Sequence, residues 1–96
     1  MLFKKKKLGN IYAVTGGDYM GEFFVLVEKT DKDYIFLSLP DFYVRHVPKD
    51  KYKFGVQNKI LDFREKLPQD IFKDCMNKYT ELKLLNHGKT IIDRRE

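Results

Sequence analysis

The sequence predicts a small, mainly β protein of the α+β class: a compact barrel of about five short antiparallel strands with one C-terminal amphipathic helix. Before Pro68, short stretches rich in β-branched and aromatic residues alternate with glycine, proline and polar turns, as in a chain of short strands. After Pro68 the apolar residues recur three and four positions apart, which is the spacing of a helix. The length of 96 residues is that of one domain, and a hydrophobic share of 43% suffices for a core.

The strand-like stretches are expected at residues 10–15, 22–29, 34–39, 42–47 and 59–64. The apolar run Phe23–Val27 predicts a strand covered on both faces. The polar residues 30–33 predict a turn that joins this strand to the next in a hairpin. Pro40 and Pro48 are expected to end the third and fourth strands, because proline cannot donate a hydrogen bond to a neighbouring strand.

The loops, the helix and the ends of the chain are assigned from glycine, proline and polar residues that interrupt the strand pattern. Three glycines between Gly16 and Gly21 predict a loop that needs positive φ angles. Residues 49–58 are polar and contain Gly55, so we expect a turn-rich loop there. The helix should begin near Pro68 and bury one stripe, formed by Ile71, Phe72, Cys75, Met76, Tyr79 and Leu82. We expect residues 1–8 to form a flexible basic arm, residues 9–85 one domain, and residues 86–96 a polar tail.

The charge and the cysteine content restrict the environment and the partner. The formal net charge is +5, from 19 Lys and Arg against 14 Asp and Glu. Such a balance favours an anionic partner, and the alternative is a basic surface that serves only solubility. A single cysteine cannot form an internal disulfide, which fits a reducing compartment, and neither a secretory signal nor a run of 18 apolar residues is seen. We therefore expect a cytoplasmic protein.

The segment from Gly9 to Val27 resembles the KOW motif of ribosomal proteins and transcription elongation factors. Gly9 and Asn10 match its opening, and Phe24 stands where the family has a further glycine. The remaining matches are two alternating apolar residues and two glycines four positions apart: Tyr12, Val14, Gly17 and Gly21. The resemblance implies an SH3-like barrel that touches nucleic acid or a nucleoprotein complex.

A second resemblance is to the MazF and PemK ribonuclease toxins, which also build SH3-like barrels. The residues that resemble them are Gly9–Tyr12 at the opening and Val25–Val27 in the second strand. These toxins carry an Arg-Pro pair just before that strand, and Phe23-Phe24 stands in its place here. The residue that would be chemically useful is therefore absent, and the resemblance implies the fold more than the activity.

The sequence predicts no enzyme, no metal site and no cofactor. Cys75 falls on the apolar stripe of the helix, where a buried thiol is inert. His46 and His87 have no other His, Cys or carboxylate at the spacing of a metal site. The glycine loop lacks the Lys-Ser/Thr of a P-loop and does not lead into a helix. Close acidic pairs occur in charged turns of most proteins and do not by themselves indicate acid–base chemistry.

The segment 42–54 interleaves aromatic and basic residues, which is typical of a surface for nucleic acid. Alternatively, its apolar residues belong to the core and its lysines protect a strand edge. With the lysine arm and the glycine-loop tyrosine, which should be exposed, the candidate binding residues are Lys4, Lys5, Lys6, Lys7, Tyr19, Tyr43, Arg45, His46, Lys49, Lys51, Tyr52 and Lys53.

We expect these residues to bind RNA or DNA, or a nucleoprotein complex, without catalysis. The alternative is a small inhibitor or adaptor of bacterial or phage origin. In that case Tyr19, Tyr43 and Tyr52 would be exposed anchors for a protein partner, and the lysines would steer the encounter. A ribonuclease similar to MazF is the third hypothesis.

Overall fold

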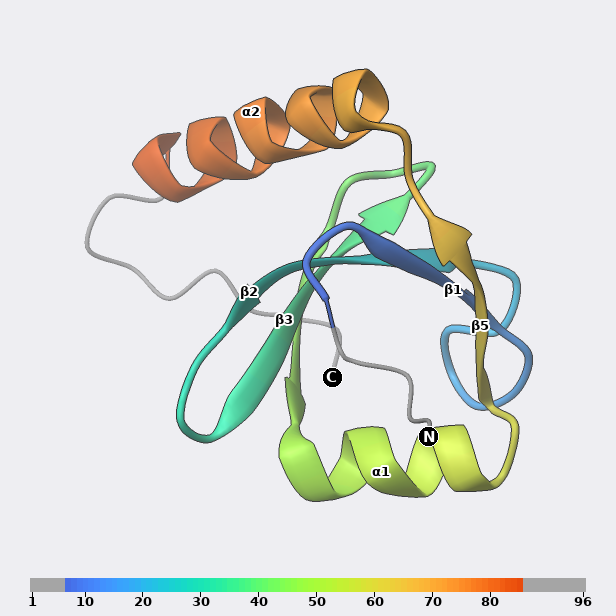
Figure 1. Ribbon diagram of the computed structural model, residues 1–96. Helices are drawn as coiled ribbons and strands as arrows, with labels where there is room; N and C mark the ends of the chain where they lie inside the picture. Colours follow the sequence, from blue (N-terminus) through green and yellow to red (C-terminus); the bar gives the residue numbers. More distant parts are fainter. Residues whose placement is uncertain (1–6, 86–96) are drawn as a thin grey trace.

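The computed structural model describes residues 7–85 and consists of a curved antiparallel sheet with a helix on each side (Figure 1). The five strands are β1 (Asn10–Val14), β2 (Phe23–Lys29), β3 (Asp33–Leu39), β4 (Val44–Pro48) and β5 (Leu61–Lys66). The helices are α1 (Lys49–Gln57) and α2 (Gln69–Leu85). The strands form one open sheet in the order β4-β3-β2-β1-β5, so β1 pairs with both β2 and β5.

The prediction of five antiparallel strands is confirmed, including the hairpin between β2 and β3. In its turn, the backbone N–H of Thr30 donates to the carbonyl of Asp33, and the N–H of Asp33 donates to the Thr30 hydroxyl. At the base of the glycine loop the backbone N–H of Gly21 donates to the carbonyl of Val14, and Gly17 and Gly21 adopt positive φ angles of 81° and 98°. The predicted need for glycine is therefore confirmed at these two positions.

Strand β2 is covered on both faces, as its continuous apolar run predicts. Phe24 and Leu26 face one side of the sheet, and Val25 and Val27 face the other. The first side carries a buried cluster that we call the α1 core, formed by Tyr12, Val14, Phe24, Leu26, Tyr34, Phe36, Tyr52 and Leu61. The second side carries the α2 core, formed by Val25, Val27, Ile35, Leu37, Val44, Cys75 and Tyr79.

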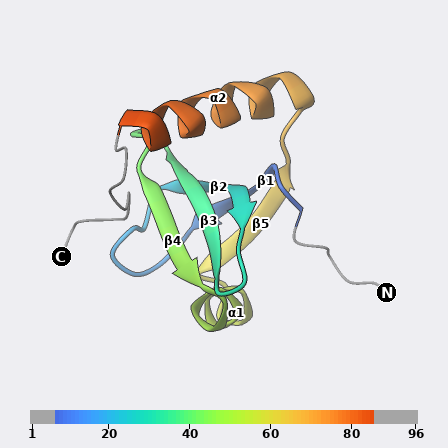
Figure 2. The same cartoon turned by 90° about the vertical axis from the view of Figure 1, so that its left-hand side faces the viewer.

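Two irregularities accompany the curvature of the sheet around the α1 core. The register shifts between Leu26 and Glu28 in the pairing of β2 with β3, and between Ile11 and Tyr12 in the pairing of β1 with β5. Such bulges increase the local twist and bend the strand that carries them. Figure 2 shows the strands turning around the end of α1 while α2 runs across the opposite side.

Helix α1 corrects the prediction of a loop at residues 49–58. Its buried stripe consists of only Tyr52 and Gly55, too narrow a pattern to stand out in the sequence. Gly55 costs helix stability, but it permits close packing, because a Cβ built there would lie 3.2 Å from the Leu61 side chain. The helix follows Pro48, which provides no side-chain cap, so the usual signal of a helix start is also missing.

Helix α2 matches the predicted C-terminal helix, with one exception along its stripe. Cys75 and Tyr79 are buried, and Phe72, Met76 and Leu82 pack against the α2 core. Ile71, in contrast, is 47% exposed. The Tyr79 hydroxyl donates to the Glu28 carboxylate on β2, and burial together with this bond raises the pKa of Tyr79. The predicted single helix is thus one of two.

Candidate functional site

Helix α1 crosses the curved face of the sheet with a hollow on each side. It contacts β3, β4 and β5, but with nine residues it covers the face incompletely. One hollow lies between α1 and the glycine loop, and the other lies between α1 and the paired strands β1 and β5. We call them the glycine-loop pocket and the β5 pocket.

The glycine-loop pocket has a volume of about 710 Å³ and brings together predicted residues from three segments. Tyr19 comes from the loop, His46 from β4 and Lys51 from α1. Phe54 forms part of the wall and remains 60% exposed, so its ring is accessible to a ligand. Most of the other lining residues are apolar or glycine: Val14, Gly16, Gly17, Phe24, Val47, Pro48, Gly55, Ile60 and Leu61.

Arg45 packs against Tyr19, which lines this pocket. Its burial contradicts the prediction that it is a phosphate ligand. The side chain is buried, with 1% of the residue exposed, and its Nη2 donates to both oxygens of Glu22, at 2.9 and 3.2 Å. The guanidinium lies 4.0 Å from the ring centroid of Tyr19 and 4.8 Å from that of Tyr43. Arg45 therefore connects the start of β2, the glycine loop and β4, and it is not on the surface.

The two neighbouring tyrosines differ in exposure. Tyr43 is 50% exposed, as an interface residue should be. Tyr19 is only half-buried rather than fully exposed at the loop tip, because its ring packs on Arg45 and on Phe24 of the α1 core. The glycine loop thus folds its aromatic residue back over the sheet, which holds one wall of the pocket in place.

Tyr52 is not an exposed anchor, and this part of the prediction is wrong. It is 7% exposed, since it occupies the buried stripe of α1 and its ring packs edge-on against Tyr34 at 4.7 Å between centroids. Its hydroxyl lies 2.8 Å from that of Tyr12, and the two share a hydrogen bond. Burial, followed by this bond, raises the pKa of Tyr52 well above its ordinary value.

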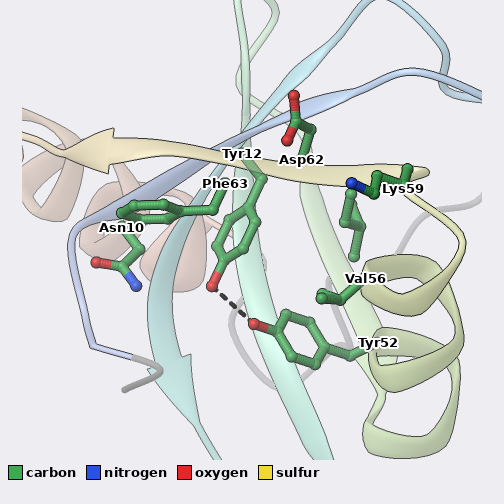
Figure 3. A pocket seen from close by; sticks show the side chains of 8 residues that line it. Asn10, Tyr12, Tyr52, Val56, Lys59, Asp62 and Phe63 are labelled. Carbon is green, nitrogen blue, oxygen red and sulfur yellow. Dashed lines mark hydrogen bonds between the residues drawn. The ribbon is translucent and has the colours of Figure 1, made fainter. Parts of the chain in front are cut away.

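The β5 pocket has a volume of about 360 Å³ and contains this tyrosine pair (Figure 3). Asn10 is 5% exposed although its side chain is polar. Phe63 of β5 lies edge-on to the Tyr12 ring at 5.8 Å between centroids and remains 39% exposed. The complete lining consists of Asn10, Tyr12, Tyr52, Val56, Lys59, Leu61, Asp62 and Phe63.

Sequence reasoning missed most of the β5 pocket. Tyr52 is its single predicted member, assigned there as an exposed group. A signal existed in Asn10, a polar residue at the start of an apolar strand. Phe63 gave another, because it occurs in a short strand whose other side chains are mainly charged. Neither signal indicates a pocket without the three-dimensional pairing of β1 with β5.

The basic charge of the described residues is concentrated at α1. Residues 7–85 contain thirteen Lys and Arg against twelve Asp and Glu. Within residues 49–59, which are α1 and the turn after it, four lysines face one acid, Asp50. The rest of the described chain has nine basic against eleven acidic residues. The positive potential of the folded part is therefore expected on the α1 side.

The remaining predicted residues lie around α1 or outside the described part. Lys53 is exposed on α1, and the Lys49 ammonium lies 5.4 Å from the Tyr34 ring centroid. His46 Nδ1 is 4.0 Å from a carboxylate oxygen of Asp33. Lys7 is exposed at the start of the described chain. Lys4, Lys5 and Lys6 of the predicted arm and residues 86–96 of the predicted tail lie outside it.

Among residues 7–85, no group of three His, Cys, Asp or Glu side chains is placed to hold a metal ion. Neither α1 nor α2 is long and apolar enough to cross a membrane. No protein-family profile matches the chain, and no curated protein and no solved structure is significantly similar to it.

Proposed function

We propose that the chain is a non-enzymatic binding module whose α1 side binds single-stranded nucleic acid. The observation that carries the proposal is the concentration of basic charge on residues 49–59, between two hollows that each expose an aromatic ring. Nucleic acid needs this combination, since cations neutralise phosphates and ring faces stack on bases.

Each part of the α1 side has a role in the proposal. The ammonium groups of Lys51, Lys53 and Lys59 contact phosphates and give most of the affinity, independently of sequence. Phe54 in one hollow and Phe63 in the other offer ring faces to bases. Stacking of this kind is available to the unpaired bases of a single strand and not to the interior of a duplex. The partner is therefore single-stranded RNA or DNA.

The strand order supports assignment of the fold to SH3-like barrels. An interior β1 that pairs with β2 and with the edge strand β5, strong curvature with two bulges, and a short helix between β4 and β5 are compatible with such a barrel. SH3-like barrels often use the first loop to touch RNA or protein, and that loop forms one wall of the glycine-loop pocket. The fold analogy raises the expectation of binding but does not identify the ligand.

A labelled single strand of about ten nucleotides, mixed with the protein at several salt concentrations, tests the proposal. We expect an electrophoretic shift or a rise in fluorescence anisotropy at low salt that weakens steeply as salt increases. Absence of binding to both RNA and DNA at low salt would overturn it. RNA recovered intact from the same mixtures would exclude the ribonuclease hypothesis for that RNA.

A protein partner is the second candidate, favoured by the lining of the glycine-loop pocket. Apolar side chains dominate this lining, and the charges on it include the carboxylates of Asp18 and Asp50, which repel phosphates. An apolar side chain of another protein would fit such a hollow. Nuclease-treated lysate separates the two candidates. A partner that stays bound without nucleic acid, and is lost in Phe54→Asp, would favour this one.

A further inference from the structure

We infer that the β5 pocket is a subsite that recognises one base of the bound strand through hydrogen bonds to a base carbonyl. The inference rests on the proposed function and adds to it a preference among bases. It starts from the paired hydroxyls of Tyr12 and Tyr52, which lie inside this pocket (Figure 3).

The tyrosine pair has one hydroxyl hydrogen more than its mutual bond uses. Each hydroxyl carries one hydrogen, and a single bond of 2.8 Å joins the two oxygens. One hydroxyl donates, and the hydrogen of the other points elsewhere. Both side chains are more than nine-tenths buried, so this remaining donor needs an acceptor that enters the pocket. Burial raises the pKa of Tyr52, so its hydroxyl keeps its hydrogen at neutral pH.

The surroundings of the pair match a planar ring with polar edges. Asn10, almost fully buried, lines the same pocket and gives it a second polar side chain. Phe63 presents a partly exposed ring at the wall, and Lys59 stands at the pocket on the α1 side. The carboxylate of Asp62, which lines the same pocket, points away from the hydroxyl pair (Figure 3).

A base with a ring carbonyl meets these requirements. Uracil, thymine, cytosine and guanine each present a carbonyl oxygen that can accept from the tyrosine hydroxyl. Adenine has ring nitrogens as acceptors but no carbonyl. Stacking on Phe63 holds the ring, and Lys59 is then within reach of the adjoining phosphate. The pocket volume of about 360 Å³ accommodates one base with its sugar and not a folded protein segment.

The test measures affinity for oligo(U) and for oligo(A) of the same length, with wild type and two variants. We expect wild type to prefer oligo(U) at least about fivefold. Tyr12→Phe/Tyr52→Phe, which removes both hydroxyls and keeps both rings, should lose most of this preference and keep its affinity for oligo(A). Phe63→Leu should weaken both oligonucleotides by roughly fivefold or more. Phe42→Leu is the matched control, because Phe42 is 38% exposed and does not line either pocket. Circular dichroism verifies that each variant is folded.

The outcomes separate the subsite from the proposed function. Equal affinity of wild type for the two oligonucleotides would overturn the subsite and leave the proposed function standing. The same holds if Phe63→Leu behaves like Phe42→Leu. Binding of uridine monophosphate, reduced in Phe63→Leu, without binding of any oligonucleotide would support the pocket and contradict the proposed function. No binding of either ligand would overturn both.

Discussion

The two helices cover the two faces of the sheet to very different extents. On the α2 side, a helix of 17 residues closes a core of aliphatic side chains, Cys75 and Tyr79. On the α1 side, a helix of nine residues inserts Tyr52 into an aromatic core and leaves a hollow on each flank. The lysine-rich segment, the exposed rings of Phe54 and Phe63 and the hydrogen-bonded tyrosines all belong to this side.

The difference indicates a division between stability and binding. A face that is fully covered gains the most from burial of apolar area, whereas a face that is partly covered keeps side chains accessible to a ligand. The α2 side should therefore determine mainly whether the chain is folded. The α1 side should determine, in addition, what the folded chain binds.

Two neighbouring residues of β3 test the comparison of the two faces directly, and their replacement should give the largest changes in the free energy of unfolding. Leu37 faces the α2 core and Phe36 the α1 core, and both are fully buried. Leu37→Ala should lower the free energy of unfolding by about 2–5 kcal/mol, and Phe36→Ala by about 3–5 kcal/mol. Urea denaturation measures these changes.

Binding at low temperature then distinguishes the two variants. Phe36→Ala should also weaken the oligonucleotide affinity of the folded fraction, because the Phe36 ring packs against Tyr12 and Tyr52. Leu37→Ala should not change that affinity. If both variants weakened it equally, the division between the faces would be wrong.

The buried ion pair of Arg45 with Glu22 gives the next effect. Arg45→Ala leaves the partly buried carboxylate of Glu22 without its guanidinium and should cost about 3–5 kcal/mol of unfolding free energy. The matched control is Arg64→Ala, whose pair with Asp62 is about half exposed on both sides and should contribute about 0–1 kcal/mol. Thermal unfolding measures both. A similar small cost for the two variants would contradict the structural role assigned to Arg45.

Removal of lysines should reduce binding only on the α1 side. Lys51→Ala/Lys53→Ala should lower oligonucleotide affinity at low salt and reduce the slope of log affinity against log salt by about 1–2. The control, Lys73→Ala/Lys83→Ala on α2, changes the net charge equally. Equal losses in the two double variants would show that net charge alone, and not the α1 side, attracts the strand.

The decline of the free energy of unfolding at alkaline pH is the smallest predicted effect. Burial raises the pKa of Tyr52 and of Tyr79 in the folded state, so the neutral hydroxyls are favoured there. The stabilisation that these neutral hydroxyls contribute is fully present below about pH 10, the pKa of tyrosine in an unfolded chain. It is lost as the pH rises above that value. Each tyrosine should contribute a decline of about 1.4 kcal/mol per pH unit.

Tyr52→Phe should flatten this decline, and Tyr34→Phe serves as the comparison. Urea denaturation between about pH 8 and pH 11, from roughly two units below the tyrosine pKa to one unit above it, measures the slope. The same slope in wild type and Tyr52→Phe would contradict the raised pKa of the buried hydroxyl.

The sequence predicted the strands well because their signals are local. The apolar run Phe23–Val27, the glycines at positions 17 and 21, and the helical stripe after Pro68 each specify their own conformation. Helix α1 was missed for the converse reason. Tyr52 and Gly55 are buried only because the curved sheet surrounds them. Gly55 packs against Leu61, whose position is fixed by the pairing of β5 with β1.

The candidate site was predictable in composition but not in arrangement. The segment 42–54 does contain binding candidates, and Lys51 and Lys53 are accessible. However, the same pattern of aromatic and basic residues contains Arg45, which a distant carboxylate at Glu22 holds inside, and Tyr52, which a distant hydroxyl at Tyr12 holds inside. Those partners lie 23 and 40 residues away, so inspection of the segment alone does not find them.

Chemical-shift mapping of the ¹⁵N-labelled protein during titration with a single-stranded oligonucleotide tests the central claim most directly. We predict shifts at Lys51, Lys53 and Phe54 on α1 and at Phe63 on β5, which weaken as salt is added, with little change along α2. Shifts centred on α2, or none at low salt, would contradict the claim that the α1 side is the binding surface.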